Sequence, residues 1–167
     1  KLDDSGDAVF ALKPGIAGLG ALTPYVMVNF RDDPVFLSPQ GVFAIATNAI
    51  TSTRNTMPRS ERIDGRLVSE PGLQEAVGVE YNKYLYIAVN GHVYVADAAQ
   101  RTEGKRDEQF QYEWYYWTGV PARVWFKHGG ALWFGTDKGE IFRFHTEKTA
   151  AAYSDNGRPI HAYWTSP

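Results

Sequence analysis

Residues 76–97, "AVGVEYNKYLYIAVNGHVYVAD", carry the clearest strand pattern of this chain. They read as a strand, a polar loop, a second strand, a glycine turn and a third strand, which is the pattern of two successive hairpins. The segments 84–89 and 93–96 are unbroken apolar runs. A strand with one wet face alternates apolar and polar residues, so these strands are expected to be covered on both faces.

The same pattern occurs twice more, as "PYVMVNFRDDPVFLSPQGVFAI" at 24–45 and "ARVWFKHGGALWFGTDKGEIFRF" at 122–144. The turn glycines of the three copies, Gly41, Gly91 and Gly139, lie 50 and then 48 residues apart. A further aromatic strand follows the second and third copies, "YEWYYWT" at 112–118 and "IHAYWTS" at 160–166. Four antiparallel strands per unit at a period of about 40–50 residues are typical of the blades of a β-propeller.

We therefore predict an all-β, β-propeller-like fold with about three four-stranded antiparallel blades. The chain is expected to form one domain, 1–167, with an irregular lead-in at 1–23 and units at about 24–70, 71–118 and 119–167. Because propellers typically close with about four to eight blades, three units imply a partial propeller or a fragment. The absent initial Met also suggests a fragment. A β-sandwich of short strands joined by glycine turns stays open as an alternative.

The pattern also predicts where the strands and the core lie. Strands are expected near 25–30, 34–38, 42–46, 76–81, 84–90, 92–97, 112–118, 122–127, 131–136, 140–145 and 160–165. Within them, four large apolar residues are predicted to lie in the packed interior of their units: Leu85, Tyr94, Trp133 and Phe142.

Composition narrows the classes of function. With 44% hydrophobic and 14% aromatic residues, the 167-residue chain can form a core. A net charge of −2 gives no field to attract nucleic acid, which is not expected as a partner. The absence of cysteine excludes disulfides, thiolate metal sites and a cysteine nucleophile. No apolar stretch is long enough to cross a membrane, and the early acidic residues Asp3, Asp4 and Asp7 do not fit a signal peptide.

No catalytic, cofactor or metal site is predicted. The glycine-rich segment 14–22 lacks the Lys-Ser/Thr ending of a phosphate loop, and the G-x-S-x-G motif of many hydrolases is absent. Asp32 and Asp33 fit a solvated loop tip better than a cation or ligand site. The four histidines are scattered without the spacing of a shared metal site: His92, His128, His145 and His161.

Two surface features are candidates for binding. The polar segment 51–66 is locally basic, although a solvated excursion of the first unit explains it more simply. The aromatic strands could stack on sugars, although their recurrence at equivalent positions favours packing between blades. The candidate interaction surface drawn from these features comprises Arg54, Arg59, Arg62, Trp114, Trp117, Tyr163 and Trp164.

Several motifs resemble those of propeller-type proteins encoded by tailed phages and by prophages of bacterial genomes. They are "DDPVFLSPQGVFAI", "LQEAVGVEYNKYLYIAVNGHVYVAD", "YEWYYW", "LWFGTDKGEIFRF" and the closing "GRPIHAYWTSP". The resemblance runs from about residue 24 to the end of the chain. It implies a non-enzymatic structural component of the virion, in the tail or the head-to-tail region, and it brings no catalytic residues with it.

Two hypotheses follow. The first is a phage or prophage structural protein, located in the virion or in the cytoplasm of the bacterial host, whose blades are a platform for assembly. Its partners would be other virion proteins, further blades of the same protein, or copies of itself, because three blades cannot bury all their apolar faces. The second is a propeller that binds a carbohydrate or another ligand, with or without catalytic activity. Few paired carboxylates of the kind a glycosidase needs are present, which favours the first hypothesis.

Overall fold

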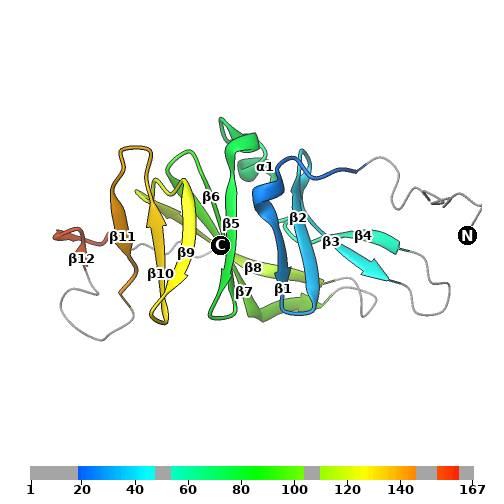
Figure 1. Ribbon diagram of the computed structural model, residues 1–167. Coiled ribbons are helices and arrows are strands. Elements are labelled where there is room, and N and C mark those ends of the chain that lie inside the picture. Colours follow the sequence, from blue (N-terminus) through cyan, green and yellow to red (C-terminus); the bar gives the residue numbers. More distant parts are fainter. Residues whose placement is uncertain (1–18, 48–53, 104–109, 146–153, 162–167) are drawn as a thin grey trace, which may run out of the picture.

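The computed structural model describes residues 19–47, 54–103, 110–145 and 154–161 (Figure 1). These residues form three antiparallel sheets and one short hairpin. The first sheet has the order β1-β2-β3-β4, with β1 (Met27–Phe30), β2 (Asp33–Ser38), β3 (Gly41–Thr47) and β4 (Arg54–Pro58). Each strand pairs with the next strand of the chain, so the sheet is a simple meander.

The second and third sheets repeat this meander. The second contains β5 (Val77–Tyr81), β6 (Tyr84–Val89), β7 (His92–Glu103) and β8 (Phe110–Thr118). The third contains β9 (Val124–His128), β10 (Ala131–Gly135) and β11 (Ile141–Arg143). The hairpin consists of β12 (Ser154–Asp155) and β13 (Arg158–Pro159).

Short helices connect the first two sheets. The 3-10 helix η1 (Pro24–Val26) precedes β1, and the hydroxyl of Thr23 accepts a hydrogen bond from the backbone N–H of Tyr25 at its start. Between β4 and β5 lie the helix α1 (Asp64–Leu67) and the 3-10 helix η2 (Leu73–Glu75). None of the helices in the described part of the chain is long and apolar enough to cross a membrane.

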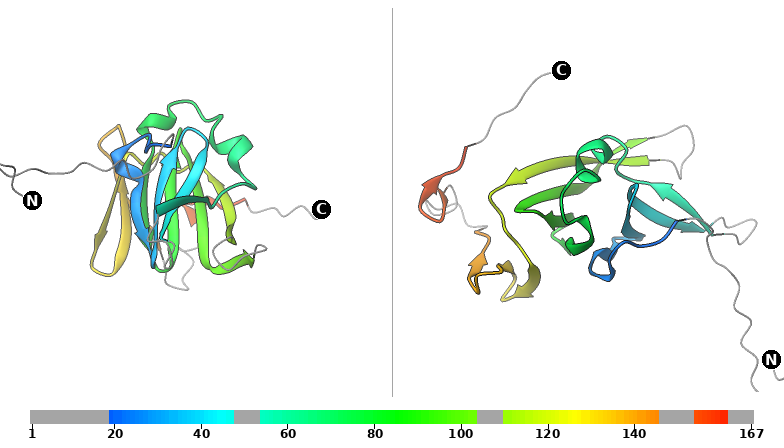
Figure 2. Two further views of the ribbon diagram at one scale, coloured as in Figure 1. Left: turned by 90° about the vertical axis from the view of Figure 1, so that its right-hand side faces the viewer. Right: turned by 90° about the horizontal axis from the view of Figure 1, so that it is seen from above.

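The three sheets stand face to face in a row, with their first strands side by side (Figure 1). β1 contacts β5, and β5 contacts β9. Seen from above, the described sheets follow one another in an open arc (Figure 2). The all-β prediction is thus confirmed, while closure into a propeller stays a prediction.

The middle sheet is buried on both faces, as its continuous apolar runs predict. Leu85, Ile87 and Tyr94 pack toward the first sheet in one core cluster. Tyr86 and Val93 pack toward the third sheet in a second cluster. Successive side chains of a strand point to opposite faces, so one apolar run supplies both clusters.

Ten of the predicted strands correspond to strands of the structure within a few residues. The sequence missed β4, which lies inside the polar segment expected to be a solvated excursion. Of the strand expected at 160–165, residues 160–161 are not in a strand and the others lie outside the described residues.

The predicted core is correct in part. Leu85 and Tyr94 are buried, with exposed fractions of 0% and 1%. Trp133 and Phe142 are only half-buried. On β10 the fully packed residues are Leu132 and Phe134, because Trp133 points to the face of the third sheet that the middle sheet does not cover.

Adjacent residues of β10 provide a direct test of this arrangement. Phe134→Ala removes a ring that lies 5.2 Å from Phe142 and 5.6 Å from Phe144, measured between ring centroids. The free energy of unfolding should fall by about 3–5 kcal/mol, because a cavity remains in a packed interior. Trp133→Ala should cost clearly less in the same urea titration, even though it removes the larger side chain. Equal losses would contradict the placement of these two residues.

Candidate interaction surfaces

Arg59, one of the residues predicted to form an interaction surface, is buried instead. Its exposed fraction is 2%, and its Nε donates a hydrogen bond to Oδ2 of Asp33 at 2.7 Å. Its Nη2 donates to Oδ1 of the same carboxylate at 3.2 Å, so the pair is bidentate. The prediction failed because the segment was interpreted as a solvated loop, whereas β4 carries the chain back to the interior at this point.

The Arg59–Asp33 pair joins the first and second sheets. The hydroxyl of Tyr112 in β8 donates to Oδ2 of Asp33 at 3.0 Å. Nη1 of Arg59 donates to the carbonyl oxygen of Phe110 at 3.2 Å, and its guanidinium carbon lies 3.8 Å from the centroid of the Phe110 ring. Asp33 is therefore structural, while its neighbour Asp32 is exposed as expected for a loop tip.

Two of the other arginines of the segment also contact the second sheet. Arg62 is exposed and forms an ion pair with Glu113 of β8. The guanidinium carbon of Arg66 lies 4.4 Å from the centroid of the Tyr116 ring. Arg54 is in β4, opposite Thr47. The cationic groups of Arg59, Arg62 and Arg66 thus connect the segment to the second sheet.

The predicted aromatic residues differ in exposure. Trp114 is half-buried, and its indole N–H donates to the carbonyl oxygen of Arg59 at 2.9 Å. Trp117 is 39% exposed at the border of an aromatic cluster, 5.8 Å from Tyr86 and 6.1 Å from Phe144. Of the two, Trp117 has the more accessible ring. Tyr163 and Trp164 lie outside the described residues.

The histidines do not come together in the structure. Among the described residues, no group of three or more His, Asp or Glu side chains is arranged to hold a metal ion. His92 packs 5.1 Å from the Tyr116 ring, and its buried Nδ1 has no hydrogen-bond partner among the residues that the structure describes.

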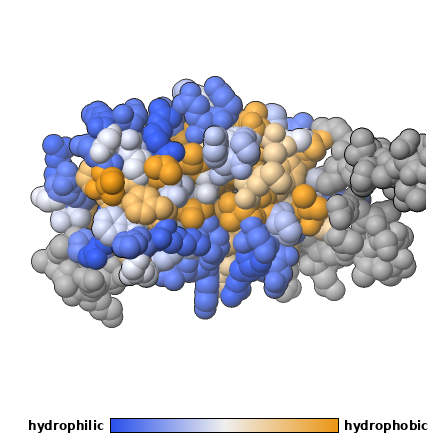
Figure 3. Space-filling model, in the orientation of Figure 1, coloured by the Kyte–Doolittle hydropathy of each residue, from blue (hydrophilic) through white to orange (hydrophobic). Residues whose placement is uncertain are grey.

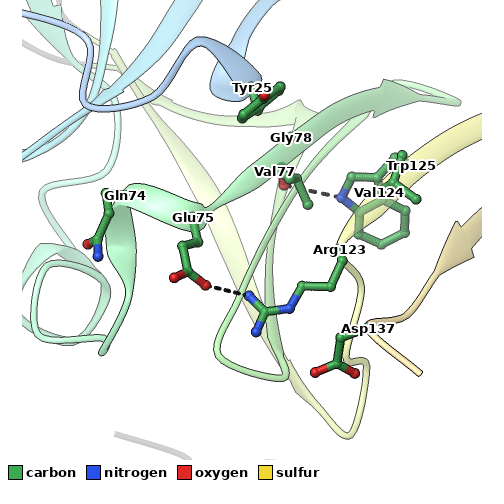
Figure 4. Close-up of a pocket in the computed structure, with 9 residues that line it drawn as sticks. All are labelled: Tyr25, Gln74, Glu75, Val77, Gly78, Arg123, Val124, Trp125 and Asp137. Atoms are coloured by element: carbon green, nitrogen blue, oxygen red, sulfur yellow. Dashed lines mark hydrogen bonds and ion pairs between the residues drawn. The ribbon is translucent and has the colours of Figure 1, made fainter. Parts of the chain in front are cut away.

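A groove of about 860 Å³ lies at the ends of the first strands, where β5 and β9 begin (Figure 4). Tyr25 of η1, 68% exposed, stands on one side, and Trp125 lies on the other. Nη1 of Arg123 donates to Oε2 of Glu75 at 2.8 Å, and this ion pair crosses the groove (Figure 4). Both of its side chains are about half exposed, and such pairs contribute only about 0–1 kcal/mol. A ligand could replace either partner at low cost.

Apolar side chains gather across the middle of the face that presents β1, β5 and β9, between hydrophilic borders (Figure 3). Large exposed apolar residues belong to these strands and their neighbours: Met27 at 60%, Val124 at 53%, Phe126 at 37% and Ile141 at 64%. Sequence reasoning did not single out these four residues. For Val124 and Phe126 the signal is the apolar triplet 124–126 at the start of β9, which supplies side chains to both faces of the sheet when only one is covered.

No family model, no curated protein and no solved structure matches this chain.

The buried ion pair gives a testable prediction. Asp33→Ala leaves the guanidinium of Arg59 buried without its carboxylate, which should lower the free energy of unfolding by about 3–5 kcal/mol. Arg62→Ala, a matched control, removes an exposed pair and should cost only about 0–1 kcal/mol. Urea denaturation followed by tryptophan fluorescence measures both losses. A loss for Asp33→Ala no larger than that of the control would show that the cluster does not join the sheets.

Buried tyrosines make stability depend on alkaline pH. Burial, and next the neighbouring Tyr84, raises the pKa of Tyr86 to about 12 from its ordinary value of 10.0. The folded chain therefore keeps a proton that the unfolded chain releases, so this contribution is fully present below about pH 10 and is lost as the pH rises toward 12. Tyr86→Phe should weaken the decline in stability over this window, measured by urea titrations at a series of pH values. An unchanged decline would mean that Tyr86 does not contribute.

Proposed function

We propose that this chain is a non-catalytic assembly module with a propeller-like arrangement, which works by presenting the faces of its end sheets to other β-sheets. The observation that carries the proposal is the exposure of apolar side chains on the third sheet, above all Ile141 and Val124 at 64% and 53%. A contiguous apolar patch of this kind typically marks an interaction surface.

The order of the sheets supports the propeller-like interpretation. In each sheet the first strand lies beside the first strand of its neighbour, and the chain leaves each four-stranded sheet from its last strand to begin the next. Blades of a propeller are connected in this way around a central axis. No other described sheet covers the outer face of the first sheet or of the third, and further blades or another protein would pack there.

The sequence resemblance supports a particular location and particular partners for this module. Motifs such as 132–144 and 157–167 resemble those of propeller-type proteins of tailed phages and prophages. On this basis the chain is a structural component of the virion, in the tail or the head-to-tail region, and is made in the cytoplasm of the bacterial host. Its partners are other virion proteins or further blades of the same protein.

The assembly role is tested in particles. Virions released from the phage or lysogen that encodes the chain should contain it in amounts stoichiometric with other structural proteins. An Ile141→Lys allele should give particles that lack the protein, because a charge in an apolar contact is not compensated. Gln40→Lys adds the same charge at an exposed turn outside the end faces and should assemble normally. If wild-type particles lack the protein, or if the Ile141→Lys protein is incorporated normally, the proposal is overturned.

A second candidate function is binding of a carbohydrate in the groove of Figure 4. The exposed ring of Tyr25 and the polar side chains of Gln74, Glu75, Arg123 and Asp137 line this groove. A ring face and planar polar groups together suit a sugar, which has apolar faces and many hydroxyls. A glycan array with the full chain tests the idea, with Tyr25→Ala as the variant that should lose the signal. An array without any bound glycan rejects it.

A further inference from the structure

The faces of the three sheets can be compared row by row, because the strand register is repeated. In the middle sheet, Val77, Ala88 and Val93 are cross-strand partners in one row, and Val79, Tyr86 and Val95 form the next row. These rows point to the third sheet and belong to the core cluster between the two sheets. We call the face of each sheet that carries such rows its forward face.

The forward face of the third sheet carries equivalent rows, which no other described sheet covers. Val124, Gly135 and Ile141 are cross-strand partners, and Phe126, Trp133 and Arg143 form the next row. In both sheets the middle residue of the first row is small, Ala88 or Gly135. The middle residue of the second row is aromatic in both, Tyr86 or Trp133. The rings of Phe126 and Trp133 stack with centroids 6.0 Å apart. The forward face of the third sheet therefore has the same pattern of residues as the face with which the middle sheet contacts the third sheet.

The opposite side of each sheet, its rear face, repeats in the same way. Gly78, Ile87 and Tyr94 form a row on the middle sheet, and Trp125, Phe134 and Phe142 form a row on the third. The row on the middle sheet lies in the core between the first and second sheets. The row on the third sheet lies in the core between the second and third sheets. Within the chain, each of the two sheet-to-sheet contacts thus joins a forward face to a rear face.

The first sheet carries the matching rear row at the other end of the arc. Met27, Phe36 and Phe43 are cross-strand partners there. Phe36 is already covered within the chain at 4% exposure, whereas Met27 is 60% exposed. Beside this row lies a hollow of about 190 Å³, lined in part by Met27, Asn29 and Ile45. A partner sheet would meet an exposed methionine and an apolar hollow.

We infer that the open forward face of the third sheet binds the rear face of the first sheet in a second copy of this chain. The pairing continues the interface that occurs twice within one copy, and one chain carries both halves of it. The contact is head-to-tail, so it leads to a ring if the rotation closes and to a filament if it does not. This inference rests on the proposed assembly function and names one partner for it.

Two single replacements test the pairing. Ile141→Lys blocks the forward face of the third sheet, and Met27→Lys blocks the rear face of the first; both positions are mostly exposed, so the fold should persist. Circular dichroism and urea denaturation check that each variant folds. Val124→Lys and Asn29→Lys are a second pair on the same two faces, for use if either of the first variants does not fold.

Light scattering after size exclusion measures the mass of each sample of the full chain. We expect the wild type to exceed the monomer mass and each variant alone to be a monomer. An equal mixture of the two variants should give pairs with twice the monomer mass, because each supplies the face that the other lacks. Gln40→Lys, the same charge on an exposed turn, should behave as the wild type.

Other results overturn the inference. If Met27→Lys alone still associates, like faces pair with each other, and assembly occurs without head-to-tail contact. If the mixture of variants stays monomeric, the two faces do not recognise each other. If the wild type is monomeric at high concentration, a second copy is not the partner. The assembly function is then still tested separately, by whether virions contain the protein.

Discussion

The structure depends on the need to cover both faces of the middle sheet. The run Tyr84–Val89 has apolar side chains on its two faces, and leaving either face in water would cost about 25 cal/mol for each Å² of apolar surface. One covering sheet, as in a sandwich, would satisfy only one face. The first and third sheets supply the two covers, but each is itself apolar on its second face. Apolar faces that need a cover are therefore found at the two ends of the stack of sheets.

Polar contacts then fix how the sheets are aligned. Between the first and second sheets, the carboxylate of Asp33 accepts hydrogen bonds from both Arg59 and Tyr112. A buried ion pair adds little stability over a well-packed apolar pair, but a shifted alignment would leave a buried charge without its partner. Between the second and third sheets the core contacts are aromatic, as between Tyr86 and Trp125 at 5.9 Å. Polar contacts at the borders add to them, among them the exposed ion pair of Lys127 with Glu80 at 3.2 Å.

The sequence predicts the meanders well because their determinants are local: glycine turns and apolar runs of fixed length. It does not predict β4, since Arg59 looks like a solvated charge until the chain brings Asp33 beside it across 26 positions. It also places Trp133 in the interior, because a strand that is apolar on both faces does not reveal which face its neighbour covers. The groove between Tyr25 and Arg123 is invisible for a similar reason, as its walls come from separate segments. Local pattern thus determines the sheets, and tertiary packing determines the surfaces.

The first residue of the rear row differs between the three sheets. On β5 this residue is Gly78, where an added Cβ would lie only 3.1 Å from Cγ1 of Val26, so η1 packs closely against β5. On β9 it is Trp125, whose indole N–H donates to the carbonyl oxygen of Val77 at 3.1 Å. On β1 it is Met27, which is unbranched and can adapt its shape to its surroundings. The exposed end of the described stack therefore carries the most adaptable of the three side chains, at the position where the proposed partner would pack.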